Sequence, residues 1–99
     1  MYTQVERRSI NLATIEETIK RAQAEFFPKI QAAGGFVGFY LVTDEKENVN
    51  TAVVVWDSKE AAEAFKSANS AWLDTLEGLG HKLQSTNEGE TAIELQPAK

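Results

Sequence analysis

Few side chains in this sequence could take part in chemistry. The chain of 99 residues contains no cysteine and a single histidine, His81. Thiolate nucleophiles and thiolate-bound metals are therefore excluded, and carboxylates are the only plentiful metal ligands. The sequence also has no glycine-rich phosphate loop. We therefore expect no bound metal and no haem or flavin cofactor.

The remaining candidates are aromatic and polar side chains beside apolar stretches. A tyrosine or an asparagine could hydrogen-bond to a ligand, a tryptophan could stack on an aromatic one, and an arginine could meet an anionic one. The substrate-binding candidates are Trp56, Tyr40, Asn69, Trp72 and Arg7. Each also has a structural interpretation, because tryptophans usually pack in cores and the polar groups usually bond to backbone, surface carboxylates or water.

The roles of the two arginines Arg7 and Arg8 and of His81 depend on their position in an element. In a regular strand Arg7 and Arg8 point to opposite faces, so one could meet a ligand while the other pairs with surface carboxylates. His81 follows Gly80 in a predicted loop, where a histidine is usually solvated.

The elements that would position these side chains centre on residues 36–56. Two apolar runs, residues 36–42 and 52–56, flank the charged segment 44–48 and predict a β-hairpin. Neither run alternates apolar with polar residues, so both faces of the hairpin must be covered.

A strand and a helix are predicted before the hairpin. Residues 2–10 suit a more polar first strand. Thr14 and Glu17 have the spacing of a capping box, and apolar residues then recur at steps of three and four. Pro28 should kink or break this helix near residues 26–27, because its ring clashes with the preceding turn.

A second helix and a closing strand are predicted after the hairpin. Asp57 and Ser58 offer an N-terminal cap, and Gly78 marks the end of the helix. A turn is predicted at residues 87–89, and the closing strand is clearest at residues 91–95.

The order strand-helix-strand, taken twice, predicts a single α+β domain over residues 1–99. It is the ferredoxin-like βαββαβ arrangement, a four-stranded antiparallel sheet with both helices on one face. The other face would expose an apolar patch, and a two-fold related copy could cover it. We therefore expect a homodimer, in which two sheets form a dimeric α+β barrel.

Three segments, residues 26–30, 35–42 and 55–61, resemble the antibiotic biosynthesis monooxygenase type of dimeric α+β barrel proteins. The likeness spans nearly the whole chain and is closest to a bacterial branch in which a tryptophan corresponds to Trp72. The resemblance implies a pocket lined from the strand positions that include Trp56. The alternate positions would then meet the second subunit, and these dimer interface candidates are Thr51, Val53 and Val55.

The resemblance also indicates which reactions of this superfamily are expected of this sequence. Its polyketide monooxygenases have a tryptophan matched by Trp56, but the asparagine four residues earlier is Ala52 here, which counts against the same reaction. The haem-degrading members use an asparagine, a tryptophan and a histidine at positions that correspond to Arg7, Phe65 and Thr75. Haem degradation is therefore not expected.

Two function classes stay open. One is an oxidoreductase of the cofactor-independent monooxygenase type, acting on a small aromatic or quinol substrate. The other is a non-catalytic small-molecule-binding or stress-related homodimer. Fifteen acidic and ten basic residues, a net charge of −5, argue against nucleic-acid binding. No apolar run is long enough to span a bilayer, and we expect a cytoplasmic protein.

Overall fold

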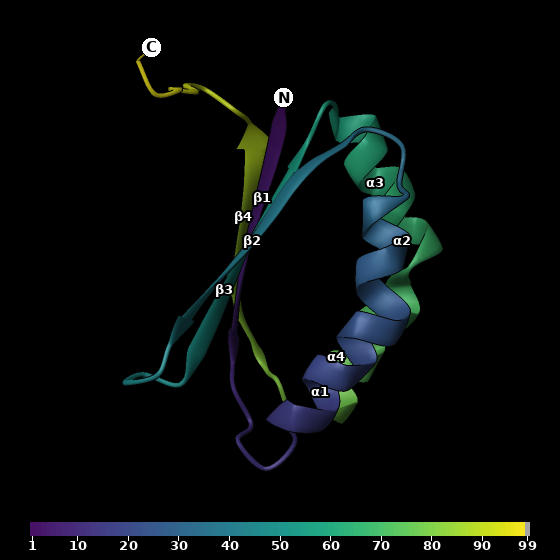
Figure 1. Cartoon of the computed structure of the whole chain (residues 1–99), viewed down its shortest axis with the longest axis vertical. Coiled ribbons are helices and arrows are strands. Elements are labelled where there is room, and N and C mark those ends of the chain that lie inside the picture. The colour runs from purple at the N-terminus through teal and green to yellow at the C-terminus, as the bar shows by residue number, and fades with distance from the viewer. Residues whose placement is uncertain (99) are drawn as a thin grey trace.

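The sheet is built on two central strands, β1 (Tyr2–Ser9) and β3 (Val49–Trp56), which pair antiparallel along their whole length. Strand β2 (Phe36–Asp44) flanks β3, and β4 (Leu83–Glu90) flanks β1, giving the order β2-β3-β1-β4. The computed structural model describes residues 1–98 and places all the helices on one face of this sheet (Figure 1). The predicted ferredoxin-like α+β arrangement is confirmed.

The first helical segment is broken where the sequence predicts. It comprises α1 (Ile15–Arg21), a π-helical turn η1 (Ala22–Phe26) and α2 (Phe27–Gln31). Pro28 lies in the first turn of α2, where its missing N–H would have no helical partner in any case. The wider turn before it absorbs the clash of the proline ring with the preceding carbonyl.

The second helical segment is also divided, whereas the sequence predicts a single helix there. It comprises α3 (Lys59–Ala68) and α4 (Ser70–Gly78), separated by Asn69. The predicted cap is present, since the Ser58 hydroxyl accepts a hydrogen bond from the Ala61 N–H at 3.1 Å. Asn69 leaves the helical conformation with φ −128° and ψ 26°. An asparagine can do this because its side chain bonds to nearby backbone.

The core lies between the sheet and the helices, around Trp56. Tyr2, Ile30 and Ala62 complete the buried cluster, and Trp56 is only 1% exposed. The chain enters β2 through Gly35, whose φ of +80° suits glycine. A Cβ atom there would lie 2.6 Å from the Ala61 Cβ, so no larger residue fits this approach of β2 to α3.

Two predictions about the closing strand are wrong. Strand β4 covers Leu83–Glu90, so the predicted turn at residues 87–89 lies inside a strand, and residues 91–95 are not a strand. The reason is the register with β1, in which Tyr2 is paired with Glu90. Next to this pair, the Thr91 N–H donates to the Met1 carbonyl at 2.8 Å.

The capping box at the start of α1 is not formed. The Thr14 hydroxyl donates to the Leu79 carbonyl at 2.6 Å instead of accepting a backbone N–H of its own helix. The end of α4 lies beside this turn and competes for the hydroxyl, which the local sequence could not show.

Within residues 1–98, no helix covers the second face of the sheet (Figure 1). Tyr40 is 64% exposed and Val42 59% exposed on this face. Within residues 1–98, no helix is long and apolar enough to cross a membrane.

Candidate functional site

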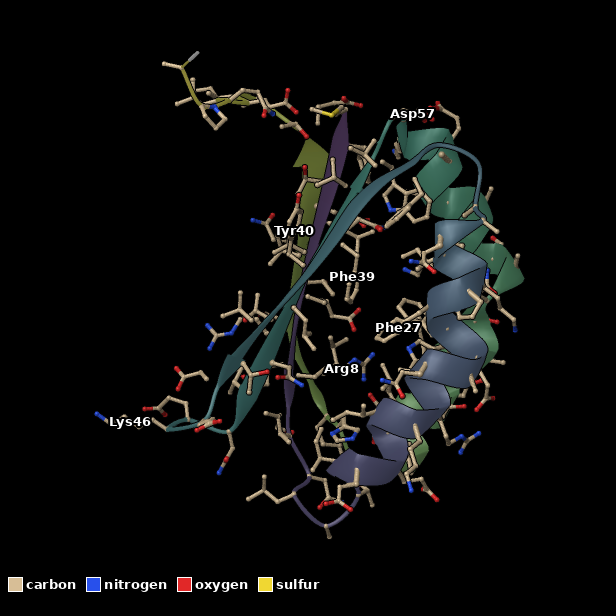
Figure 2. The ribbon with its side chains drawn as sticks, in the orientation of Figure 1. Arg8, Phe27, Phe39, Tyr40, Lys46 and Asp57 are labelled. Atoms are coloured by element: carbon tan, nitrogen blue, oxygen red, sulfur yellow. The ribbon has the colours of Figure 1, made fainter. Side chains whose placement is uncertain are left out.

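A cavity of about 760 Å³ lies between the helices and the covered face of the sheet. Strands β1 and β3 supply its floor, and side chains of both helical segments supply the opposite wall (Figure 2). Its lining includes six aromatic side chains, Phe26, Phe27, Phe39, Phe65, Trp56 and Trp72. An apolar cavity with a few polar groups is the usual form of a small-molecule site.

Phe26 is at the centre of the aromatic lining. Its ring stacks on Trp72 with a centroid distance of 5.3 Å and an interplanar angle of 15°. It also meets Phe39 and Phe65 edge to face, at 5.8 and 6.1 Å. The π-helical turn ends at Phe26, so the irregular geometry before Pro28 positions the ring that joins the two helical segments.

Trp56 belongs both to the lining of the cavity and to the buried core cluster. Its indole N–H donates to Gln4 Oε1 at 2.9 Å, and Gln4 Nε2 donates to Glu88 at 2.9 Å. The indole ring packs against Phe65 with a centroid distance of 5.3 Å. Trp56 therefore presents an aromatic surface to the cavity, while its polar hydrogen is already bonded.

Asn69 and Trp72 also line the cavity, from the break between α3 and α4. The carboxamide Nδ2 of Asn69 donates to the Phe65 carbonyl at 2.9 Å, closing the end of α3. Three of the five substrate-binding candidates, Trp56, Asn69 and Trp72, are thus brought together.

The other two candidates, Tyr40 and Arg7, lie on the opposite face of the sheet. Tyr40 pairs with Val53 and Arg7 with Thr51, both on β3 positions that alternate with Trp56. Both side chains are exposed and neither lines the cavity. The interface candidates Thr51, Val53 and Val55 share this uncovered face, as the strand alternation requires.

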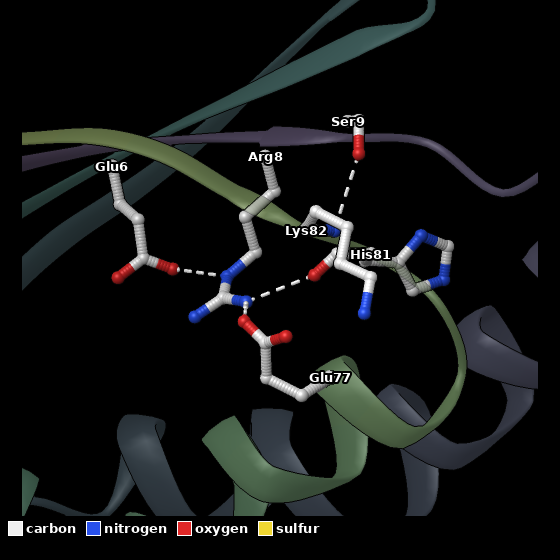
Figure 3. A network of polar contacts seen from close by, with 6 residues as sticks. All are labelled: Glu6, Arg8, Ser9, Glu77, His81 and Lys82. Carbon is white, nitrogen blue, oxygen red and sulfur yellow. Dashed lines mark hydrogen bonds and ion pairs between the residues drawn. The ribbon is translucent and has the colours of Figure 1, made fainter.

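Arg8 is the arginine that reaches the cavity. Strand alternation left open which of Arg7 and Arg8 would do so, and the choice of Arg7 as the substrate-binding candidate was wrong. It is 8% exposed and pairs across the sheet with Asn50, on the same face as Trp56. Its Nε donates to Glu6 at 2.6 Å, and its Nη1 donates to Glu77 and to the His81 carbonyl, each at 2.9 Å (Figure 3). The hydrogen bond from Arg8 lowers the pKa of Glu77.

His81 is buried rather than solvated. It is 4% exposed, its Nδ1 accepts the Asn11 N–H at 3.2 Å, and its Nε2 lies 2.7 Å from the Thr18 hydroxyl. That hydroxyl donates to the Thr14 carbonyl, so it accepts from Nε2–H and fixes the neutral tautomer. Burial lowers the pKa of His81, and the positive charge of Arg8 lowers it further.

No local pattern in the sequence predicts that Arg8 lines the cavity or that His81 is buried. Alternation places Arg7 and Arg8 on opposite faces, but only the register with β3 shows which of them shares the face of Trp56. His81 is buried because α4 ends against the turn that precedes α1. In residues 1–98, no group of three histidine, cysteine or acidic side chains could hold a metal ion.

No protein-family profile matches the chain, and no curated protein matches it by sequence. Solved structures do match. A Deinococcus radiodurans protein, provisionally described as an antibiotic biosynthesis monooxygenase, superimposes with a TM-score of 0.74 at 15% identity, covering 100% of both chains. The monooxygenase from the gene ActVA-Orf6 of Streptomyces coelicolor, solved with the ligand nanaomycin D, gives 0.75 at 16% identity, covering 98% of this chain and 92% of that one.

A third match is SnoaB, a cofactor-independent oxygenase from Streptomyces nogalater, solved as a single-residue mutant. Its TM-score is 0.65 at 23% identity, and 98% of this chain and 97% of that one are covered. These similarities extend over the whole described structure rather than over one motif. The chain therefore has the fold of the antibiotic biosynthesis monooxygenase structures, which its sequence predicts.

Proposed function

We propose that this protein is a homodimeric oxidoreductase of the cofactor-independent monooxygenase type, acting on a small aromatic or quinol substrate. The observation that supports this most strongly is the aromatic lining of the cavity beside Trp56. A volume of about 760 Å³ is in the range of small-molecule sites. Two structures of the same fold are described as a cofactor-independent oxygenase and as a monooxygenase holding nanaomycin D.

The chemistry would come mainly from the substrate. An electron-rich aromatic ring supplies electrons to O₂, one oxygen atom enters the ring system, and the other leaves as water. The cavity contributes by excluding water and by placing hydrogen-bond donors where negative charge develops. Stacking against the aromatic lining would hold the ring.

A second function is favoured by the polar groups of the site. The Trp56 N–H and the Asn69 Nδ2 are both bonded within the protein, and Ala52 offers no polar group. Tyr40 lies outside the cavity. A non-catalytic dimer that binds or carries an aromatic molecule, including one with a stress-related role, would need no further polar groups.

The homodimer is proposed from the uncovered face of the sheet. Tyr40 and Val42 of β2 lie there with the apolar positions of β3, Val53 and Val55. An apolar face of this kind is unfavourable in water, and a second copy carries the same patch. We propose that Thr51, Val53 and Val55 meet the second subunit.

Oxygen uptake tests the enzymatic proposal. A panel of quinols and anthrones should consume O₂ faster with the protein than without it. Ala52→Phe would place a ring into the cavity and should reduce the rate about tenfold or more, whereas Ala64→Phe on the exposed surface of α3 should not. Binding without oxygen uptake would support the non-catalytic function, and neither binding nor uptake would contradict both.

A further inference from the structure

Arg8 places a guanidinium group between the sheet and the helices. Its side chain extends from β1 toward the helical wall (Figure 2), and it is one of the residues that line the cavity. The side chain is 10% exposed. A cationic group this buried needs acceptors for its N–H groups.

The protein supplies acceptors for three of the five N–H groups that a guanidinium carries. Nε donates to Glu6, and Nη1 donates to Glu77 and to the His81 carbonyl. Within residues 1–98 the hydrogen bonds of Arg8 involve Nε and Nη1 and leave Nη2 without an acceptor. Among the six residues drawn in Figure 3, no dashed line reaches this nitrogen.

The two N–H groups on Nη2 are open to a ligand. In residues 1–98 no fully enclosed side-chain nitrogen or oxygen lacks a hydrogen-bond partner. Nη2 has none and is therefore accessible. Because Arg8 lines the cavity, a molecule in the cavity can reach it.

The charges around Arg8 determine whether a neutral or an anionic ligand oxygen is the better acceptor for Nη2. One guanidinium faces two carboxylates, Glu6 and Glu77, so the group carries one net negative charge. The other charged lining residues are Glu45, Glu88 and Lys66, which leave the cavity acidic. An anionic ligand would be repelled, whereas a neutral carbonyl oxygen accepts an N–H of Nη2 without this cost.

We propose that Arg8 is a specificity-determining residue of the cavity, which selects neutral aromatic ketones and quinones over aromatic carboxylates. The aromatic lining holds the ring, and Arg8 Nη2 donates to the carbonyl oxygen. This inference rests on the proposed aromatic-binding function and adds to it the class of ligand. A site that offers buried donors discriminates against an analogue that lacks the acceptor.

Three naphthalene probes of nearly equal shape test the selection. The ketone 1-acetonaphthone, the hydrocarbon 1-isopropylnaphthalene and the anion 1-naphthoate differ only in the substituent. Titrations followed by tryptophan fluorescence should show the ketone binding about tenfold or more tightly than either of the others, because hydrogen bonds from a charged donor are strong.

Arg8→Lys removes the open donors while retaining the charge. Lysine has three N–H groups, enough for Glu6, Glu77 and the His81 carbonyl but for no ligand. The preference for the ketone over the hydrocarbon should then fall to about twofold or less. Arg7→Lys, on the opposite face, is the matched control and should leave all three affinities unchanged.

The outcomes separate this inference from the proposed function. Equal binding of ketone and hydrocarbon to the unmodified protein, or tighter binding of naphthoate, would overturn the role of Arg8 while the aromatic site stands. Failure of all three probes to bind would overturn both. If Arg8→Lys does not fold, the three titrations on the unmodified protein still test the predicted preference for the ketone.

Discussion

Trp56 and Gln4 are joined across the two central strands by a hydrogen bond from the indole Nε1–H to Gln4 Oε1 at 2.9 Å. Trp56 is 1% exposed, so this bond satisfies a donor that water could reach only poorly. It fixes the indole ring in the lining of the cavity and leaves its aromatic surface toward Phe65.

Gln4→Leu should therefore destabilise the fold. The substitution keeps an apolar contact but leaves the Trp56 N–H without an acceptor, which costs roughly 1–3 kcal/mol. The free energy of unfolding, measured by urea titration, should fall by this amount. Gln84→Leu on the exposed strand β4 is the control and should change it by less than about 0.5 kcal/mol. Equal effects of the two substitutions would contradict the assigned bond.

Val55→Arg should disrupt the proposed dimer. In a two-fold interface the substitution occurs twice, and each unpaired buried charge costs several kcal/mol. Sedimentation at micromolar concentration should show a dimer for the unmodified protein and aggregation or unfolding for the variant. Ala64→Arg, an equal change on the exposed surface of α3, should remain dimeric. A monomeric unmodified protein, or a stable Val55→Arg dimer, would contradict the proposed face.

His81 should make the fold sensitive to mild acid. Protonation requires a hydrogen on Nδ1, which already accepts the Asn11 N–H, and burial lowers the pKa of His81 below its usual value of about 6.5. The unfolded chain therefore binds the proton first. Stability should be constant above about pH 6.5 and fall as the pH drops from there toward the lowered native pKa.

The measurement is the urea midpoint between pH 7.5 and 5.0. The His81→Gln variant should be less stable than the unmodified protein at pH 7.5. Its urea midpoint should not fall between pH 7.5 and 5.0, because the titrating group is gone. Glu77 and Glu25, whose pKa values are lowered by Arg8 and Arg21, contribute stability that is lost only at lower pH, below about 4.5. An equally steep fall in the variant would show that another group is responsible.

The fold followed from the sequence because its signals are local and repeated. Apolar residues at steps of three and four mark both helical segments, and Pro28 marks the break in the first. The closing strand was misplaced because residues 91–95 have strand-like residues, yet the pairing with β1 ends at Glu90. The polar β4 is a strand only through its pairing with β1.

The site was predicted less well because it depends on register and on distant contacts. Trp56, Asn69 and Trp72 lie on apolar stripes and could be identified, whereas the choice between Arg7 and Arg8 required the pairing of β1 with β3. His81 could not be assigned, since its partners are about sixty to seventy residues away in the sequence.

We propose above that an aromatic molecule binds in the cavity beside Trp56. A ¹H–¹⁵N correlation spectrum recorded during titration with 1-acetonaphthone tests this binding. The indole N–H signals of Trp56 and Trp72 should both shift, because both rings line the cavity. The backbone signal of Leu95, in the segment beyond β4, should not move. Unchanged indole signals, or shifts confined to residues outside the cavity, would contradict binding at this site.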